Sequence, residues 1–122
     1  MSDKDNIDAA RDLFATYAQD FWKILKERGH KPANKISDKA RALIKYWDDR
    51  GKALELLHPL LSHEVEAVRY WAATGLIDRG AQEESIAVLL EVSKNPKGFM
   101  AIAAQTLLEN RGIPLSKDGD TH

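Results

Sequence analysis

The sequence predicts an all-α protein made of three antiparallel helical hairpins, and three observations lead to this fold class. Apolar residues recur at steps of three and four along almost all of the 122 residues, which is the spacing of one face of an α-helix. No stretch alternates apolar and polar residues for long enough to indicate a strand. The ending Asp/Asn-Arg-Gly occurs at residues 49–51, 78–80 and 110–112, each time after the second helix of an expected hairpin.

The first hairpin is expected from two amphipathic segments. Apolar residues at helical spacing cover residues 7–25, and we expect this helix to end at Gly29, because a glycine followed by Pro32 is a stop signal. The second helix is expected over residues 36–47. Trp47 lies on its apolar stripe and is expected in the core.

Two further hairpins follow with short connections. Helical spacing and breaks at glycine or proline place the remaining four helices at residues 53–61, 65–76, 86–92 and 99–108. We expect residues 1–115 to form a single helical domain. Residues 116–122 are polar, and we expect them to form a disordered tail.

The hairpins are imperfect copies of one unit. A shift of 32 residues aligns the end of the fourth helix, residues 76–80, with residues 108–112, and a shift of 29 residues aligns residues 49–51 with residues 78–80. In each copy we expect glycine to take a left-handed cap. We expect the arginine to face the negative end of the helix dipole.

Composition excludes several classes of protein. The chain has no cysteine, which excludes a disulfide scaffold, a thiol nucleophile and thiolate zinc sites. Its longest uncharged stretch, residues 98–108, is eleven residues long, well short of the ~20 residues that a membrane helix needs. The N-terminal residues lack an apolar signal core, so we expect a cytoplasmic protein with no membrane contact.

The sequence offers little for catalysis. His58 and His63 are five residues apart and do not share a helix face as a metal-binding pair would. Glu83 and Glu84 fall where a helix begins, and acidic residues favour that end of the helix dipole. No phosphate-binding loop or nucleophile motif occurs. We therefore expect no enzymatic activity, no metal and no cofactor.

The middle unit, residues 60–76, reads LLSHEVEAVRYWAATGL. It resembles the HEAT repeat, especially the short bacterial HEAT-like form, in its leucine pair, in Val68-Arg69, in Ala72-Ala73 and in Leu76. The resemblance implies a short right-handed superhelix of armadillo type. In that family the arginine at the place of Arg69 pairs with an acidic residue in the preceding turn, where this sequence has His63.

A second resemblance lies in the first half of the chain. The motif Asn34-Lys35-Ile36-Ser37-Asp38-Lys39, followed by the HEAT-like unit, is similar to the small bacterial family called domain of unknown function two thousand and nineteen. Members of that family are single-domain chains of about this length, and no activity is established for it as a whole. Several small helical-repeat families act as immunity proteins against bacterial toxins, so the resemblance implies that role as one hypothesis.

The second helix of each hairpin supplies the candidate binding residues, because such helices line the working face of a helical solenoid. These candidates are Asp38, Arg41, Lys45, Asp48 and Asp49 on the second helix, Tyr70, Thr74 and Asp78 on the fourth, and Ile102, Thr106 and Asn110 on the sixth. Ala67 and Phe99 fall on the same side. Exposed Tyr70 and Ile102 would favour a partner-binding face. Alternatively, the three-hairpin chain curls enough, or the long first helix folds back enough, to cover them.

Charge is distributed unevenly along the chain. Residues 23–45 hold eight basic and two acidic residues, a net charge of +6, within a chain whose net charge is −1. Lys31, Lys35 and Lys39 form a candidate basic patch. They favour an acidic or phosphate-bearing partner, although a solvated surface is the common alternative.

The leading hypothesis is a protein-binding module that acts as an immunity-type inhibitor by covering the active site of a toxin. The basic cleft of a toxin that acts on nucleic acid would meet Asp38, Asp48, Asp49 and Asp78. The alternative is nucleic-acid or anion binding through the basic stretch, which would weaken steeply with salt. The oligomeric state is left open.

Overall fold

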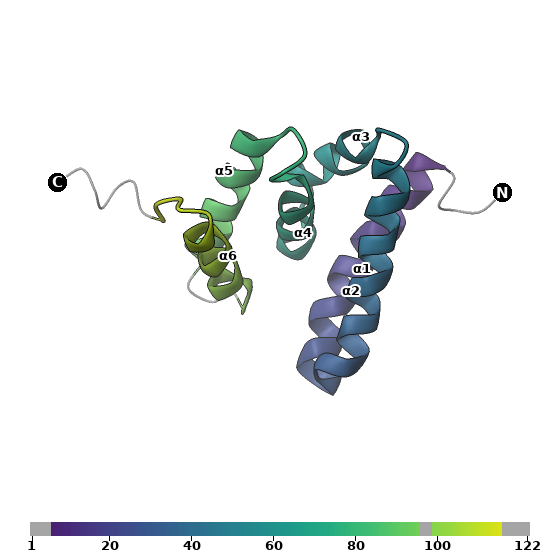
Figure 1. Cartoon of the computed structure of the whole chain (residues 1–122). Helices are drawn as coiled ribbons and strands as arrows, with labels where there is room; N and C mark the ends of the chain where they lie inside the picture. The colour runs from purple at the N-terminus through teal and green to yellow at the C-terminus, as the bar shows by residue number, and fades with distance from the viewer. Residues whose placement is uncertain (1–5, 96–98, 116–122) are drawn as a thin grey trace.

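The computed structural model describes residues 6–95 and 99–115, and every regular element in these ranges is helical. The elements in chain order are α1 (Ile7–Arg28), α2 (His30–Asp48), α3 (Ala53–Leu57), η2 (His58–Ser62), α4 (Glu66–Leu76), α5 (Gln82–Ser93) and α6 (Phe99–Asn110) (Figure 1). The prediction of an all-α protein is confirmed. The predicted tail, residues 116–122, lies outside the described residues.

The first hairpin is longer and more tightly connected than the sequence suggested. Gly29 alone links α1 to α2, with φ 87°, a value that glycine adopts readily. The prediction that α2 begins near residue 36 is wrong, because the helix begins at His30. Pro32 falls in its first turn, where a proline costs no backbone hydrogen bond.

The third predicted helix divides into two short pieces. α3 is a single α-helical segment of five residues, and η2 continues it as a 3₁₀-helix with Pro59 at its start. Proline removes a backbone donor, which favours a break in the α-helix at this point. The leucines of both pieces, Leu56, Leu57, Leu60 and Leu61, are nevertheless buried.

The core connects all three hairpins. The largest fully buried apolar side chains are Phe14, Leu56, Leu57, Leu76, Leu89, Leu108, Val68 and Val92. Trp47 is buried, as predicted. Gly75 lets α4 approach the earlier helices closely, because a Cβ there would lie 2.8 Å from Leu57 Cδ1 and 3.2 Å from Ile44 Cδ1.

The hairpins lie in chain order across the molecule. In Figure 1 the α1–α2 hairpin forms one side, α4 lies in the middle and the α5–α6 hairpin forms the other side, with α3 bridging above. α4 packs against α1, while α2 packs against α3. The second helices were expected to lie side by side in the order α2, α4, α6. Between α2 and α4 this row is interrupted, because α1 takes much of the place beside α4.

The repeated Asp/Asn-Arg-Gly endings form the predicted caps. Their glycines, Gly51, Gly80 and Gly112, all have positive φ. Arg50 Nη1 donates to the Tyr46 carbonyl and Arg79 Nη1 donates to the Gly75 carbonyl, each at a distance of 2.8 Å. In these two copies the guanidinium therefore satisfies a carbonyl at the negative end of its own helix.

The arginines of these endings also join successive hairpins. Arg79 Nε lies 3.5 Å from Asp48 Oδ2 at the end of α2. Arg111 forms a two-point pair with Asp78, with Nη1 to Oδ1 at 2.7 Å and Nη2 to Oδ2 at 2.9 Å. The C-terminal ends of α2, α4 and α6 are thus linked in order along one edge of the molecule.

We expect the Arg111–Asp78 pair to make a measurable but small contribution to stability. A double-mutant cycle with Arg111→Ala and Asp78→Ala, measured by urea unfolding, should give a coupling free energy of about 0.5–1 kcal/mol, because both groups are partly exposed. The matched Arg41–Asp38 pair, at 3.8 Å with both side chains largely exposed, should give a coupling near zero. Equal coupling in the two cycles would contradict the proposed link.

We expect Phe14→Ala to lower the free energy of unfolding by about 3–5 kcal/mol, because it removes a fully buried ring from the centre of the core. Ile102→Ala is the control, since Ile102 is 72% exposed and its truncation should change stability by less than about 0.5 kcal/mol. Urea denaturation of both variants measures the difference.

Candidate binding cleft

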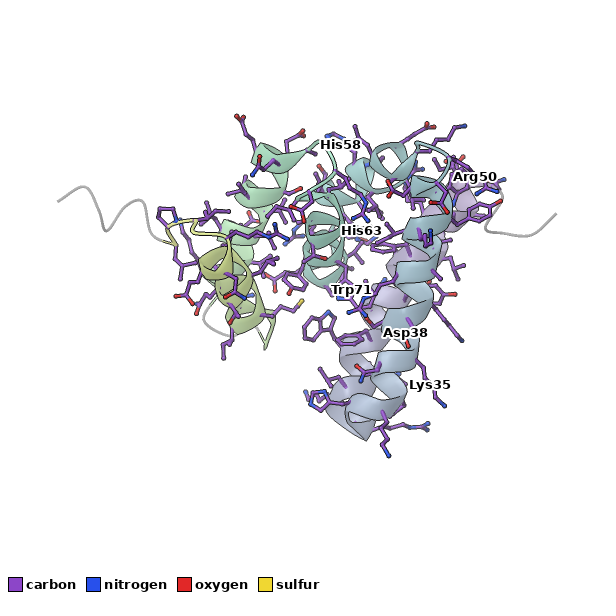
Figure 2. The ribbon with its side chains drawn as sticks, viewed as in Figure 1. Lys35, Asp38, Arg50, His58, His63 and Trp71 are labelled. Carbon is purple, nitrogen blue, oxygen red and sulfur yellow. The ribbon has the colours of Figure 1, made fainter. Side chains whose placement is uncertain are left out.

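The α1–α2 hairpin and α4 enclose an open cleft of about 380 Å³, within the usual size range of ligand-binding pockets. The residues that line it are Phe14, Phe21, Trp22, Ser37, Ala40, Arg41, Ile44, Tyr70, Trp71, Thr74 and Leu107. Figure 2 shows Trp71 on the side of α4 that faces the hairpin. The cleft is mostly apolar, with polar groups at a few positions.

Five aromatic rings form a continuous cluster along the cleft. Trp71 of α4 lies between Phe14 and Phe21 of α1, with ring centroids 6.0 Å and 5.0 Å apart. Trp22 continues the cluster, because its ring contacts Phe21 at 5.1 Å and Tyr70 at 5.9 Å. These tilted and edge-on contacts are the favourable geometry for aromatic pairs. The cluster therefore packs the two helices together and also forms a wall of the cleft.

Tyr70 is less exposed than the sequence suggested. Its side chain is partly buried, and Trp22 of α1 packs against its ring. The first helix therefore covers Tyr70 in part, whereas Ile102 stays exposed. Burial raises the pKa of the Tyr70 hydroxyl above its ordinary value. Ala67, expected on the same open side, is buried as well.

The polar groups of the cleft are contributed by α2 and α4. The Arg41 side chain is 79% exposed, and its one ion pair, to Asp38, is long at 3.8 Å. Thr74 Oγ1 donates to the Trp71 carbonyl at a distance of 2.8 Å. Ser37 lies one turn before Arg41 on the same face of α2. No carboxylate or imidazole is among the side chains that line the cleft.

Three of the predicted binding residues meet in this cleft, and the others lie elsewhere. Arg41, Tyr70 and Thr74 line it. Four of the others form ion pairs near the ends of their helices, namely Asp48, Asp78, Lys45 and Asp49. Asp38 is exposed beside Arg41 but does not line the cleft. Ile102, Thr106 and Asn110 are exposed on α6, outside the cleft lining.

Sequence reasoning missed most of the cleft wall. Trp22 and Trp71 pack between helices and also border open space. Leu107 contributes to the lining from α6 in place of the predicted residues of that helix. The one signal for the wall was the position of both tryptophans at the edges of their apolar stripes.

The basic stretch forms the far end of the first hairpin. We define the hairpin tip as residues 23–39. Its cations, Lys23, Lys26, Arg28, Lys31, Lys35 and Lys39, are all exposed, and none makes an ion pair with a residue in the described ranges. α1 is about 33 Å long and α4 about 16 Å, and Figure 1 shows the tip extending well beyond α4.

The cations of α2 occupy two different flanks of the helix. Lys31, Lys35 and Lys39 follow one another at steps of four and form a single stripe. Arg41 and Lys45 lie on another flank, and Arg41 borders the cleft. The five residues therefore do not form one continuous basic patch.

The histidines have separate structural contacts. His58 Nε2 and Glu84 Oε2 are 2.7 Å apart and join η2 to α5. His63 Nδ1 accepts from the Val65 amide at the entry to α4. Among the residues described, no group of three or more side chains could hold a metal ion, and no helix is long and apolar enough to span a bilayer.

Arg69 contacts backbone where the HEAT pattern has a carboxylate. Its Nη1 donates to the carbonyls of His63 (2.8 Å) and Glu64 (3.2 Å), and its Nε lies 3.6 Å from Glu91 Oε1 on α5. The arginine thus fixes the turn before α4 through main-chain oxygens.

Comparisons with models of known protein families, with curated proteins and with solved structures gave no match to this chain.

We expect the Tyr70 hydroxyl to ionise above the ordinary pKa of tyrosine, because burial disfavours its charged form. Subtracting the alkaline absorbance titration of Tyr70→Phe from that of the wild type should give a transition above pH ~10, the ordinary tyrosine value. Because the folded-state pKa is raised, the neutral hydroxyl favours the folded state. This contribution is complete below pH ~10 and is lost as the pH rises through the folded-state value. Stability should therefore fall less steeply with alkaline pH in Tyr70→Phe. An unchanged slope would show that the hydroxyl is solvated.

Proposed function

We propose that the protein is a non-enzymatic module that binds a protein partner through the cleft between α1, α2 and α4. The observation that carries this proposal is the composition of the cleft, in which Trp22, Tyr70, Trp71 and Arg41 border one open space. Tryptophan, tyrosine and arginine are the residues enriched at the energetic centres of protein interfaces. A lining without carboxylate or imidazole favours binding over acid–base catalysis.

We further propose that the three hairpins are a short HEAT-like stack. The repeated unit of the sequence and the pairs Arg79–Asp48 and Arg111–Asp78, which join equivalent helix ends, support this arrangement. The first hairpin departs from a regular stack, because α1 packs against α4. This departure brings the aromatic residues of α1 to the cleft.

An immunity-type role remains a prediction from the family resemblance. In that hypothesis Asp48 and Asp78 would meet a basic cleft of a toxin. Both carboxylates already pair with arginines of the next hairpin. The charges nearest the cleft therefore favour a partner whose contacting surface is acidic.

Photo-crosslinking at two matched serines tests the proposal. Benzoylphenylalanine introduced at Ser37, in the cleft, should capture a protein from a lysate of the source organism, and the adduct should be lost when Arg41→Glu is added. The same group at Ser62, exposed on η2 and outside the cleft, should not capture that protein. Equal capture from both positions, or adducts that contain only nucleic acid, would refute the proposed function.

A further inference from the structure

The cleft opens beside the most positively charged part of the molecule. Trp22 lines the cleft, and Lys26 lies one turn further along the same side of α1. Arg41 borders the cleft from α2. Cations from two helices therefore flank one aromatic surface. The hairpin tip holds five more cations besides Lys26, and Figure 2 shows one of them, Lys35, near its far end.

Few acidic side chains of the protein itself neutralise these cations. Lys26 has no ion pair with a described residue, and Arg41 reaches Asp38 only at 3.8 Å. Within the tip, the acidic residues are Glu27 and Asp38, against six basic residues. A partner at the cleft thus meets a positive field that the protein itself does not cancel.

The apolar part of the cleft calls for a different kind of contact. Its wall is made of aromatic rings and of Ile44 and Leu107, and its volume is about 380 Å³, so it suits a bulky apolar side chain. Buried anchors of this kind supply most of the energy of a protein interface, and charges at the rim guide orientation and speed association.

We propose that the cleft binds an acidic segment of a partner protein, with one bulky apolar side chain of the segment inserted among Trp22, Tyr70 and Trp71 and its carboxylates beside Lys26 and Arg41. This inference rests on the proposed function and specifies the chemistry of the partner. Charge complementarity to Lys26 and Arg41 requires a negatively charged segment. The aromatic wall requires an apolar side chain as its anchor. A nucleic acid would satisfy the cations, but its charged backbone and polar base edges match the apolar wall less well.

An unbiased selection identifies the preferred chemistry. A random peptide library is selected on the full chain after depletion on the Arg41→Glu variant, which should fold normally because Arg41 is mostly exposed. The enriched peptides should combine tryptophan, phenylalanine or leucine with flanking aspartate or glutamate. Circular dichroism of the variant confirms that depletion used a folded protein.

Binding of a selected peptide is then measured by the tryptophan fluorescence of the protein, with a tryptophan-free version of the peptide. Trp22 and Trp71 line the cleft, so occupancy should change their emission. Replacing the apolar anchor by alanine should weaken binding at least about tenfold. Lys26→Glu and Arg41→Glu should each weaken it about tenfold, and raising the ionic strength from about 0.05 M to about 0.5 M should weaken it as well.

Lys35→Glu is the matched control, because it makes the same charge change in the hairpin tip but on the other flank of α2. It should change affinity by less than about threefold. Equal losses in Lys35→Glu and Arg41→Glu would overturn the assignment of the charges to the rim, since only the overall field would then matter.

The outcomes distinguish failure of this inference from failure of the proposed protein-binding function. Selected peptides that depend on Arg41 but lack acidic residues would overturn the acidic segment and leave protein binding at the cleft standing. Absence of any cleft-dependent peptide, together with tight binding of a single-stranded oligonucleotide to the same full chain, would overturn both.

Discussion

The packing of Trp71 against Phe14 and Phe21 fixes how the first hairpin meets the rest of the molecule. Its ring lies at 6.0 Å and 5.0 Å from the two phenylalanine rings of α1, in tilted and edge-on geometry. Because α4 is held on α1 by this contact, the neighbouring Tyr70 lies against Trp22 and the cleft lies beside both. A rotation of α1 would move Phe14, Phe21 and Trp22 relative to Tyr70 and Trp71 of α4 and would reshape the cleft.

A second set of contacts joins the hairpins at their ends. Arg79 and Arg111 each reach back to an aspartate at the end of the preceding second helix, so the same short sequence ends its own helix and holds the next unit in place. Such partly exposed pairs are individually weak. They define an edge, whereas the aromatic packing and the buried leucines supply the stability. Between the first two hairpins, the packing in the interior departs from a regular stack because α1 contacts α4. At this edge, the Arg79–Asp48 pair matches the Arg111–Asp78 pair of the next two hairpins.

Local features of the sequence were sufficient to predict the helices, and contacts between hairpins were not. Glycine at a left-handed cap acts through its own backbone, so Gly51, Gly80 and Gly112 could be assigned as helix ends. Pro32 was ambiguous, because a proline is compatible both with a stop and with the first turn of α2. The coverage of Tyr70 depended on which helix lies beside α4, and periodicity along one helix does not contain that information. The pairing of Asp48 and Asp78 depended on arginines 31 and 33 residues away, for the same reason.

The length of the first hairpin and the screening of charges by salt together explain why the net charge of −1 does not describe the local charge beside the cleft. α1 is about 16 Å longer than α4, and the hairpin tip extends beyond α4 (Figure 1). Charges are screened over about 8 Å at physiological ionic strength. Acidic residues further away than this therefore do little to offset the cations of the tip. Keeping these cations on a projecting hairpin also leaves them hydrated and distant from the core, so the positive field beside the cleft imposes little cost on folding.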